Sequence, residues 1–292
     1  MHAENRNAVT AVQFGQLPAI CLQGPDGAQA TVTLFGAHLV SWRPAAGGER
    51  LFCSTRSALD GSKAIRGGVP LIFPQFAARG DGMRHGFARV STWRLAASGF
   101  EQDAAFAEFA LSSADRLAAT WAHPFDLRFR VTLSANTVQL VLHVRNTGSA
   151  GFSFAAALHS YFKIDDLDAV ALDGLNNTRY TDQTRNPPHS GRQAAQILRC
   201  PDALDRIYHA TPGDLTLHTG TGALRLQQQG FHDTVVWNPG AADAAALSDL
   251  GAGEWREFLC VEAALIDPHW LDAEQEWLGT CRIEAIAMKG QF

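Results

Sequence analysis

The chain has 292 residues, of which 46% are apolar, and its formal net charge is −5 at pH 7. This composition is typical of a globular protein with an ample core, and it gives little reason to expect binding to nucleic acid or to acidic membranes. A chain of this length can form two domains, but large β-sandwiches reach this size as one unit, so one domain over residues 1–292 is expected.

No targeting or membrane segment is evident. The first ten residues lack the apolar stretch of a signal peptide, and no uninterrupted apolar run approaches the roughly 18 residues that a spanning helix needs. The five cysteines are an odd number, widely scattered and without a CxxC pair, so neither a disulfide framework nor a zinc site is indicated. We expect a cytoplasmic protein with reduced thiols, and Cys260 buried in a strand.

Short runs of Val, Leu, Phe and Thr, broken by Gly, Pro, Asn and Asp, predict an all-β chain with little helix. Strands are expected, in chain order, at residues 30–42, 105–112, 127–135, 137–146, 152–162, 224–229 and 257–265. A turn at residues 134–136 should join the third and fourth of these strands as a hairpin. Residues 186–202 are polar and contain three prolines, so a surface loop is expected there. This pattern favours a large sandwich whose open face could hold a ligand.

The spacings that several common enzymes require are missing. There is no Walker loop, HExxH or GxSxG, and Gly220 and Gly222 are followed by Arg225 where a dinucleotide loop needs its third glycine. The 11 histidines are spread singly and none stands at paired ligand spacing. No metal and no cofactor are therefore expected.

His159 lies in an unusual strand pattern. In FSFAAALHSYF, residues 152–162, alternation places His159 on the same face as small residues, leaving an open patch where a core strand would carry larger side chains. A half-buried structural histidine, as expected for His143, is the alternative. The two expected faces are Phe154, Ala156, Leu158 and Phe162 on the core side, and Ser153, Ala155, Ala157, His159 and Tyr161 on the open side.

Glu262 stands inside the apolar strand EFLCVEAAL, residues 257–265, on the face shared with Phe258, Cys260 and Ala264. Burial of a carboxylate is costly unless the group is paired, hydrogen-bonded or functional, and it raises the pKa toward the range of a general base. A buried ion pair or exposure at a strand end would be the structural explanation. The apolar context favours a functional carboxylate.

A basic segment lies between Gly61 and Leu95. It contains six cations and one anion, a net charge of +5 in a chain of −5, which leaves −10 elsewhere. Arginine forks suit phosphate oxygens, and no glycine-rich phosphate loop is present, so side chains would have to hold an anionic ligand. Charge alone favours this interpretation no more than a solvated basic surface. The cations are Lys63, Arg66, Arg79, Arg84, Arg89 and Arg94.

Six segments form one set of motifs along the chain: IRGGVPLIFPQF (65–76), HGFAR (85–89), ALHSYFKI (157–164), LDRIY (204–208), VVWNPG (235–240) and FLCVEAA (258–264). In their composition and order they resemble the glucose-6-phosphate 1-epimerase branch of the aldose 1-epimerase superfamily. The resemblance implies a β-supersandwich of the galactose mutarotase type, with the sugar across a concave sheet face. It also implies that His159 and Glu262 are the catalytic acid/base pair, and that no metal or cofactor takes part.

The resemblance further implies the substrate-binding residues. Arg66 and Arg89 match the arginines associated with the substrate phosphate, His85 lies beside the anomeric site, and Asp205 matches a sugar-binding acid. Trp237 is expected either to line the cleft or to pack in the core. The expected partner is a small hexose 6-phosphate, without nucleic acid or membrane, bound by a monomer.

The chain departs from the family pattern at three positions. Ala77 stands where glycine is frequent, Gly240 where an aromatic residue is frequent, and Arg84 where glutamine is common. Arg84 would add a cation near the phosphate, so it is included among the substrate-binding candidates, and the preferred hexose stays open. Two alternatives also remain: a mutarotase of unphosphorylated aldoses, and a non-catalytic carbohydrate-binding module.

Overall fold

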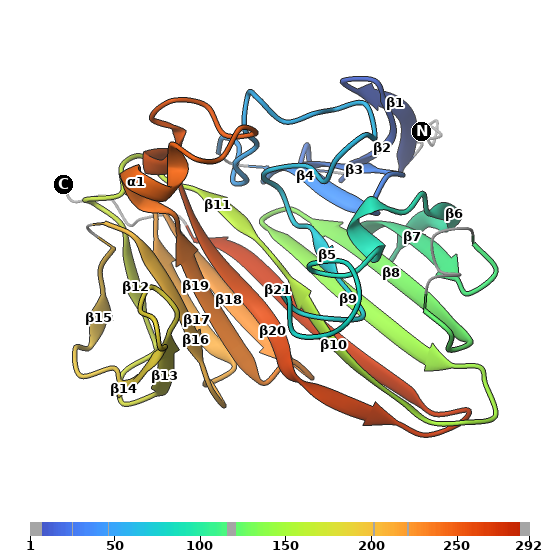
Figure 1. Cartoon of the computed structure of the whole chain (residues 1–292). Helices are drawn as coiled ribbons and strands as arrows, with labels where there is room; N and C mark the ends of the chain where they lie inside the picture. Colours follow the sequence, from blue (N-terminus) through green and yellow to red (C-terminus); the bar gives the residue numbers. More distant parts are fainter. Residues whose placement is uncertain are drawn as a thin grey trace.

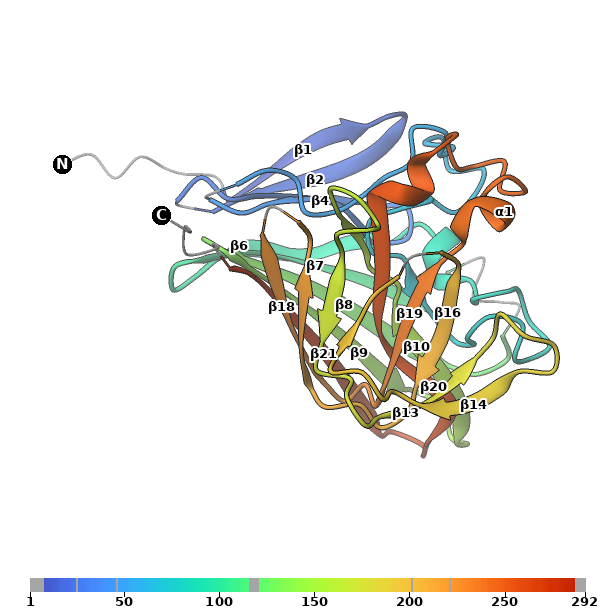
Figure 2. The ribbon, with the colours of Figure 1, turned by 90° about the vertical axis from the view of Figure 1, so that its left-hand side faces the viewer.

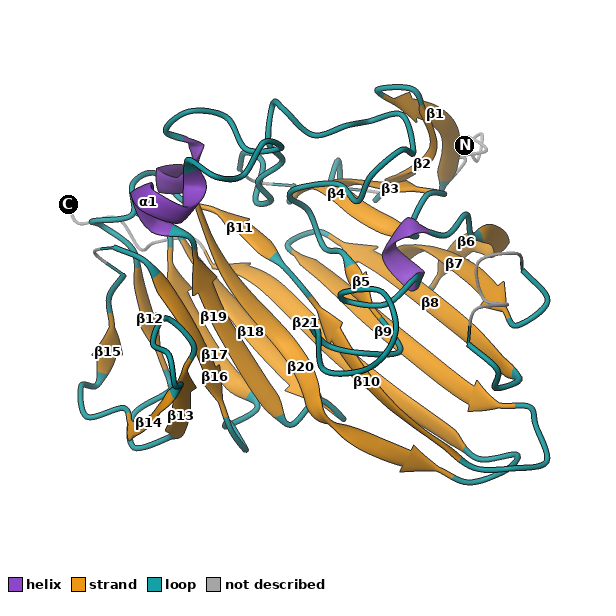
Figure 3. Ribbon diagram, in the orientation of Figure 1, coloured by secondary structure: helices purple, strands orange, loops and turns teal. Residues whose placement is uncertain are grey.

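The computed structural model describes residues 8–24, 26–45, 47–115, 121–200, 202–220 and 222–286. Strands dominate these ranges (Figure 3). Helix is limited there to α1 (Gly240–Ala244) and to 3-10 turns at Ala88–Val90 and Glu254–Glu257. Within the same ranges, no helix is long and apolar enough to cross a bilayer. The predicted all-β class with scarce helix is confirmed.

The strands form three antiparallel sheets. The N-terminal sheet has the order β1 (Val9–Phe14), β2 (Leu17–Gln23), β3 (Gln29–Thr33), β4 (His38–Arg43). The nine-stranded sheet has the order β15 (Ile197–Leu198), β12 (Ala171–Asp173), β17 (Asp214–His218), β18 (Ala223–Gln229), β21 (Glu276–Ile286), β9 (Thr137–Asn146), β8 (Phe125–Ser134), β7 (Ala104–Ser112), β6 (Arg94–Glu101). The eight-stranded sheet has the order β14 (His189–Arg192), β13 (Arg179–Asp182), β16 (Leu204–Tyr208), β19 (Asp233–Asn238), β20 (Phe258–Leu271), β10 (Phe152–Leu158), β5 (Leu71–Ile72), with β11 (Tyr161–Lys163) also beside β20.

The two large sheets pack face to face (Figures 1 and 2). In both views the N-terminal sheet and α1 lie at the same end of the long strands. Phe109 and Phe129 from the nine-stranded sheet share one buried cluster with Phe154 and Val261 from the eight-stranded sheet. Since one face of the eight-stranded sheet is used by this core, its other face is free to carry a site.

Side-chain alternation decides which residues of the eight-stranded sheet reach that other face. On β10, Ala156 and Leu158 lie in the inter-sheet core, whereas Ala155 and Ala157 lie in a separate cluster on the opposite face. The expected division of faces is therefore confirmed here. The same holds on β20, where Leu259, Val261, Ala263 and Leu265 face the core and Phe258, Cys260 and Ala264 face away. Cys260 is buried in its strand, as expected.

Three expected elements differ from the structure. Residues 30–42 form two strands because Gly36 and Ala37 adopt positive φ angles of 78° and 44°, which turn the chain between β3 and β4. Residues 152–162 are interrupted at 159–160, between β10 and β11. Residues 186–202 are not purely loop, because β14 pairs with β13 and β15 pairs with β12.

The predicted hairpin is confirmed: Ser134 of β8 pairs with Thr137 of β9.

Candidate active site

A cavity of about 630 Å³ opens on the face of the eight-stranded sheet that points away from the inter-sheet core. All eight candidate residues from the sequence lie in its lining. They come from segments spread over almost 200 residues: Arg66, Arg84, His85, Arg89, His159, Asp205, Trp237 and Glu262. The fold therefore brings the sequence candidates together, whereas their chemical roles stay predictions.

The backbone of the RGG segment positions His159. The N–H of His159 donates to the carbonyl of Pro70 at 3.1 Å, and the N–H of Tyr161 donates to the carbonyl of Gly68 at 2.8 Å. Gly68 has a φ of +57°, and a Cβ there would lie 2.4 Å from the carbonyl oxygen of Leu39. This position therefore requires glycine. The segment that carries Arg66 also holds the backbone of His159, through the carbonyl of Pro70.

His159 and Glu262 form a close pair at the floor of the cavity. His159 Nδ1 lies 3.4 Å from Glu262 Oε1, and the glutamate is only 1% exposed. Within the described residues, neither His159 Nδ1 nor Glu262 Oε2 has a hydrogen-bond partner within the usual geometric limits. Buried polar groups without hydrogen-bond partners are uncommon in proteins, and they are typical of sites that bind polar atoms of a ligand.

Burial sets the protonation preferences of this pair. It raises the pKa of Glu262 well above its usual value, and the nearby Asp205 adds to the effect. It lowers the pKa of His159 well below its usual value, with further contributions from His85, Arg89 and Arg66. The proton of the pair is therefore favoured on the glutamate in the structure.

The buried carboxylate should limit stability at neutral and alkaline pH. Since burial raises the folded-state pKa of Glu262 above 4.5, the value for an ordinary glutamate, unfolding releases its proton above that pH, and the stability of the protein falls as pH rises toward the folded pKa. Glu262→Gln lacks this ionisation. We expect it to be more stable than wild type at pH 8, on the order of 1 kcal/mol, with a smaller difference at pH 5.

Urea unfolding of both proteins at pH 5 and pH 8 measures this difference. A glutamine variant that is less stable than wild type at pH 8 would show that the ionised carboxylate has a stabilising partner in the folded state.

Arginines from the basic segment contribute to the lining of the cavity. Four of the six cations, Arg66, Arg79, Arg84 and Arg89, are in the lining, whereas Lys63 and Arg94 are not. Among the described residues, Arg84 and Arg89 have no ion-pair partner. Burial and the neighbouring Arg66 and Arg84 lower the pKa of Arg89 to about 10, although Tyr161 and Asp249 oppose this. Such a crowded, incompletely paired cation cluster favours an anion.

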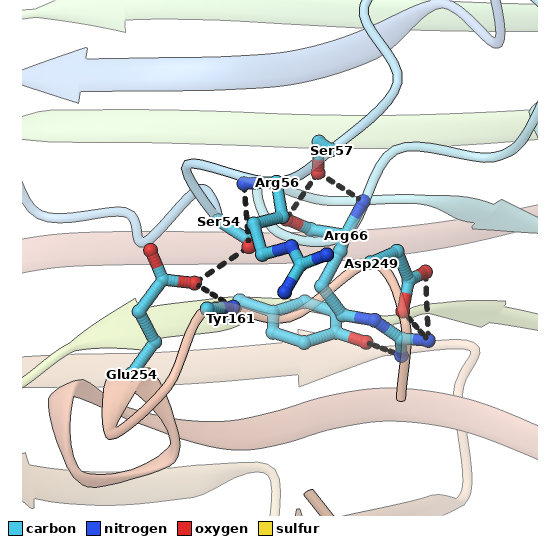
Figure 4. Close-up of polar contacts among 8 residues, drawn as sticks. Ser54, Arg56, Ser57, Arg66, Tyr161, Asp249 and Glu254 are labelled. Atoms are coloured by element: carbon cyan, nitrogen blue, oxygen red, sulfur yellow. Dashed lines mark hydrogen bonds and ion pairs between the residues drawn. The ribbon is translucent and has the colours of Figure 1, made fainter. Parts of the chain in front are cut away.

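Arg66 is held more tightly than the other arginines (Figure 4). Its Nη1 donates to the hydroxyl of Tyr161 at 3.0 Å, and its Nη2 donates to both carboxylate oxygens of Asp249 at 3.1 and 3.0 Å. Its backbone N–H donates to the hydroxyl of Ser57 at 2.9 Å, and its Nε has no partner among the described residues. Arg66 is thus fixed in place, and among the described residues its Nε and the second N–H of Nη1 have no acceptor.

His85 is a neutral hydrogen-bond donor in this site. Burial, together with Arg89, Arg84 and Arg66, lowers its pKa to about 3. Its Nδ1 accepts a bond from the backbone N–H of Ala77 at 3.3 Å, so the proton of the neutral ring is assigned to Nε2. The ring centre lies 5.7 Å from that of His159, which places it beside the pair.

Asp205 and Trp237 come from neighbouring strands. They are directly paired across β16 and β19 and both line the cavity. Burial raises the pKa of Asp205 to about 6, although Arg84 opposes this. The ring of Trp237 stands edge-on to those of His159 and Tyr161, at 6.0 and 6.1 Å, and also packs on the clusters below. Trp237 is thus a partly buried residue that both lines the cavity and packs on neighbouring apolar side chains, and its contact with a sugar stays a prediction.

The sequence did not single out Tyr161, Gln183 or Asp249 as site residues, yet all three line the cavity. A signal existed for Tyr161, which shares the open face with His159. Asp249 carried none, because it lies in a segment rich in Ala and Gly, 183 residues from its partner Arg66. Over the ranges that the structure describes, no three His, Cys, Asp or Glu side chains are grouped as metal ligands.

Comparison with known proteins places this arrangement in context. The profile of the family described as Aldose 1-epimerase matches residues 18–284. A protein of Cenchrus ciliaris, provisionally named a glucose-6-phosphate 1-epimerase, is 31% identical over 286 residues, covering 92% of this chain and 85% of its own. A protein of Escherichia coli K12 with the same provisional name is 32% identical over 259 residues, covering 86% and 84%.

Solved structures show the same fold. The crystal structure of a Salmonella typhimurium protein, provisionally named a mutarotase, superposes with a TM-score of 0.88 at 28% identity, over 97% of this chain and 95% of that one. A galactose mutarotase-like protein of Clostridium acetobutylicum superposes with a TM-score of 0.76 at 14% identity, over 96% and 98%. The fold class expected from the sequence is confirmed.

Proposed function

Because the chain belongs to the aldose 1-epimerase family, we propose that this isomerase interconverts the α and β anomers of a hexose 6-phosphate. The observation that carries the proposal is one cavity that holds both the buried His159–Glu262 pair and the incompletely paired arginines Arg84 and Arg89 beside Arg66. The relatives provisionally named glucose-6-phosphate 1-epimerases support glucose 6-phosphate as the first substrate to test.

Mutarotation needs one base and one acid at the sugar ring. We assign Glu262 as the base that takes the proton of the anomeric hydroxyl, and His159 as the acid that protonates the ring oxygen and so opens the ring. Ring closure on the opposite face of the aldehyde reverses both transfers. A pair 3.4 Å apart is close enough to serve two oxygens bonded to the same anomeric carbon.

The substrate's own charge would prepare the pair for these roles. Burial is the main cause that lowers the pKa of His159, and the nearby cations Arg89 and Arg66 lower it further. A phosphate dianion bound among the arginines would offset the contribution of these cations. The offset favours transfer of the shared proton from Glu262 to His159. The ionic form with a charged histidine would then be more populated with substrate bound than without it.

The remaining candidates would bind the phosphate and the sugar. Arg89, Arg66 and the more exposed Arg84 would bind the phosphate by charge-assisted hydrogen bonds. His85, with its proton on Nε2, would donate to an oxygen near the anomeric carbon. Asp205 would accept from sugar hydroxyls.

The direct test measures anomerisation of freshly dissolved α-glucose 6-phosphate and of α-glucose by polarimetry or exchange NMR. We expect kcat/KM for the phosphate sugar to exceed that for glucose by about 10² or more, as two charge-assisted contacts provide. Equal efficiency with both sugars would replace the proposal with an aldose mutarotase. Sugar binding without any rate enhancement would replace it with a binding module.

A further inference from the structure

We propose that Tyr161 is a positioning residue with two separable functions: its hydroxyl holds Arg66 for the substrate phosphate, and its ring orients His159. This inference rests on the proposed function, since it concerns the same cavity. It goes further, because it links Arg66, which would bind the phosphate, to His159 of the acid/base pair through a single side chain.

The hydroxyl function follows from the hydrogen bonds of Arg66. Tyr161 Oη accepts from Nη1, while Asp249 accepts from Nη2, so both ends of the fork are occupied by protein groups (Figure 4). Among the described residues, the second N–H of Nη1 has no acceptor and can meet a ligand oxygen, whereas Nε is fully buried. A guanidinium held in this way loses little rotational freedom when it binds phosphate.

Arg66 and Glu254 are both hydrogen-bonded to the segment of residues 54–57 (Figure 4). Ser57 Oγ donates to the backbone carbonyl of Arg66 at 3.1 Å. Ser54 Oγ donates to the carboxylate of Glu254 at 2.6 Å, and Glu254 follows Asp249 by five residues. The hydroxyl of Tyr161 therefore meets an arginine whose backbone is already held by Ser57.

The ring function follows from what surrounds His159. In the part of the chain that the structure describes, Nδ1 of His159 faces Glu262 and has no hydrogen bond that fixes the imidazole plane. Aromatic contacts define that plane instead. Tyr161 stacks on the imidazole with centroids 4.9 Å apart and planes 8° apart, and His85 and Trp237 stand edge-on.

Tyr161 itself has little freedom. It is 2% exposed and packs on Phe258, with ring centroids 5.1 Å apart. Its position is set by β11, whose register pairs Tyr161 with Cys260 of β20, two residues before Glu262. The ring can therefore act as a fixed wall for the histidine.

Two substitutions separate the functions. Tyr161→Phe keeps the ring and removes the hydroxyl, so we expect KM for glucose 6-phosphate to rise roughly 3- to 10-fold, with kcat and both constants for glucose unchanged. Tyr161→Leu removes the stacking ring, so we expect kcat to fall roughly 10-fold or more with both sugars. Tyr180→Phe is the matched control, because Tyr180 packs against Arg206 outside the cavity.

A double-mutant cycle gives the decisive readout. If the hydroxyl acts through Arg66, Tyr161→Phe should have no further effect on KM in an Arg66→Ala background. Parallel losses with both sugars in Tyr161→Phe, or additive effects with Arg66→Ala, would overturn the hydroxyl function. Unchanged kcat in a folded Tyr161→Leu variant would overturn the ring function.

Failure of the inference and failure of the proposed function give different results. A wild-type protein without preference for glucose 6-phosphate would overturn the proposed function, and with it the hydroxyl function. A wild-type protein with that preference, combined with an unaltered KM in Tyr161→Phe, would overturn the inference alone.

Discussion

Glu262→Gln and His159→Ala should each lower the rate of hexose 6-phosphate anomerisation by at least about 10², while the protein stays folded. The size follows from the usual contribution of one general acid or base. Glutamine keeps the shape of the carboxylate but cannot accept the anomeric proton, and alanine removes the imidazole. Polarimetry of the α-anomer, with substrate well above KM, measures the loss directly.

The chain contains a matched control pair. His143 and Glu276 lie on neighbouring strands β9 and β21, with Nε2 and Oε2 3.0 Å apart, but their side chains lie outside the cavity. His143→Ala and Glu276→Gln should leave the rate unchanged. Near-normal turnover in a folded Glu262→Gln or His159→Ala variant would remove that residue from the proposed mechanism.

The combination of effects at Glu262 is more informative than either alone. The same glutamine substitution is expected to raise stability at pH 8, because burial destabilises the ionised carboxylate that it replaces. It is also expected to abolish most of the activity, because glutamine cannot act as the base. A loss of activity caused by misfolding would instead be accompanied by lower stability.

Arg66→Ala and Arg89→Ala should each lower kcat/KM for a hexose 6-phosphate roughly 10- to 150-fold, the equivalent of one charge-assisted hydrogen bond of about 1.5 to 3 kcal/mol. Free hexose lacks the phosphate, so its kcat/KM should barely change. Arg84→Ala should have a smaller effect of the same kind, since this side chain is more exposed than Arg89.

Arg94→Ala is the control for this series, because Arg94 belongs to the same basic segment but does not line the cavity. Comparison of both sugars with each variant separates phosphate recognition from a general defect. Parallel losses with phosphorylated and free hexose would show that the arginines act on the fold rather than on the phosphate.

Local patterns in the sequence determined much of the sheet. The strand expected at residues 137–146 has the same bounds as β9, because its alternating apolar side chains fit one buried face and its turn is only two residues long. Alternation also grouped Glu262 with Phe258, Cys260 and Ala264 on one face, and the structure shows that this face points away from the inter-sheet core. Strand pattern singled out His159 and Glu262, whereas His85, Asp205 and Trp237 were predicted only through family resemblance, and the structure places all five in one cavity.

Long-range contacts decided the rest. The strands β14 and β15 form in a segment of turn-favouring composition because β13 and β12 offer partners for their backbone hydrogen bonds. The pairing of Arg66 with Asp249, and the stacking of Tyr161 on His159 at the break between β10 and β11, likewise have no local signature. A sequence specifies periodicity and turns through neighbouring residues, whereas the partner of a buried charge is chosen by whatever the folded chain brings within hydrogen-bond distance.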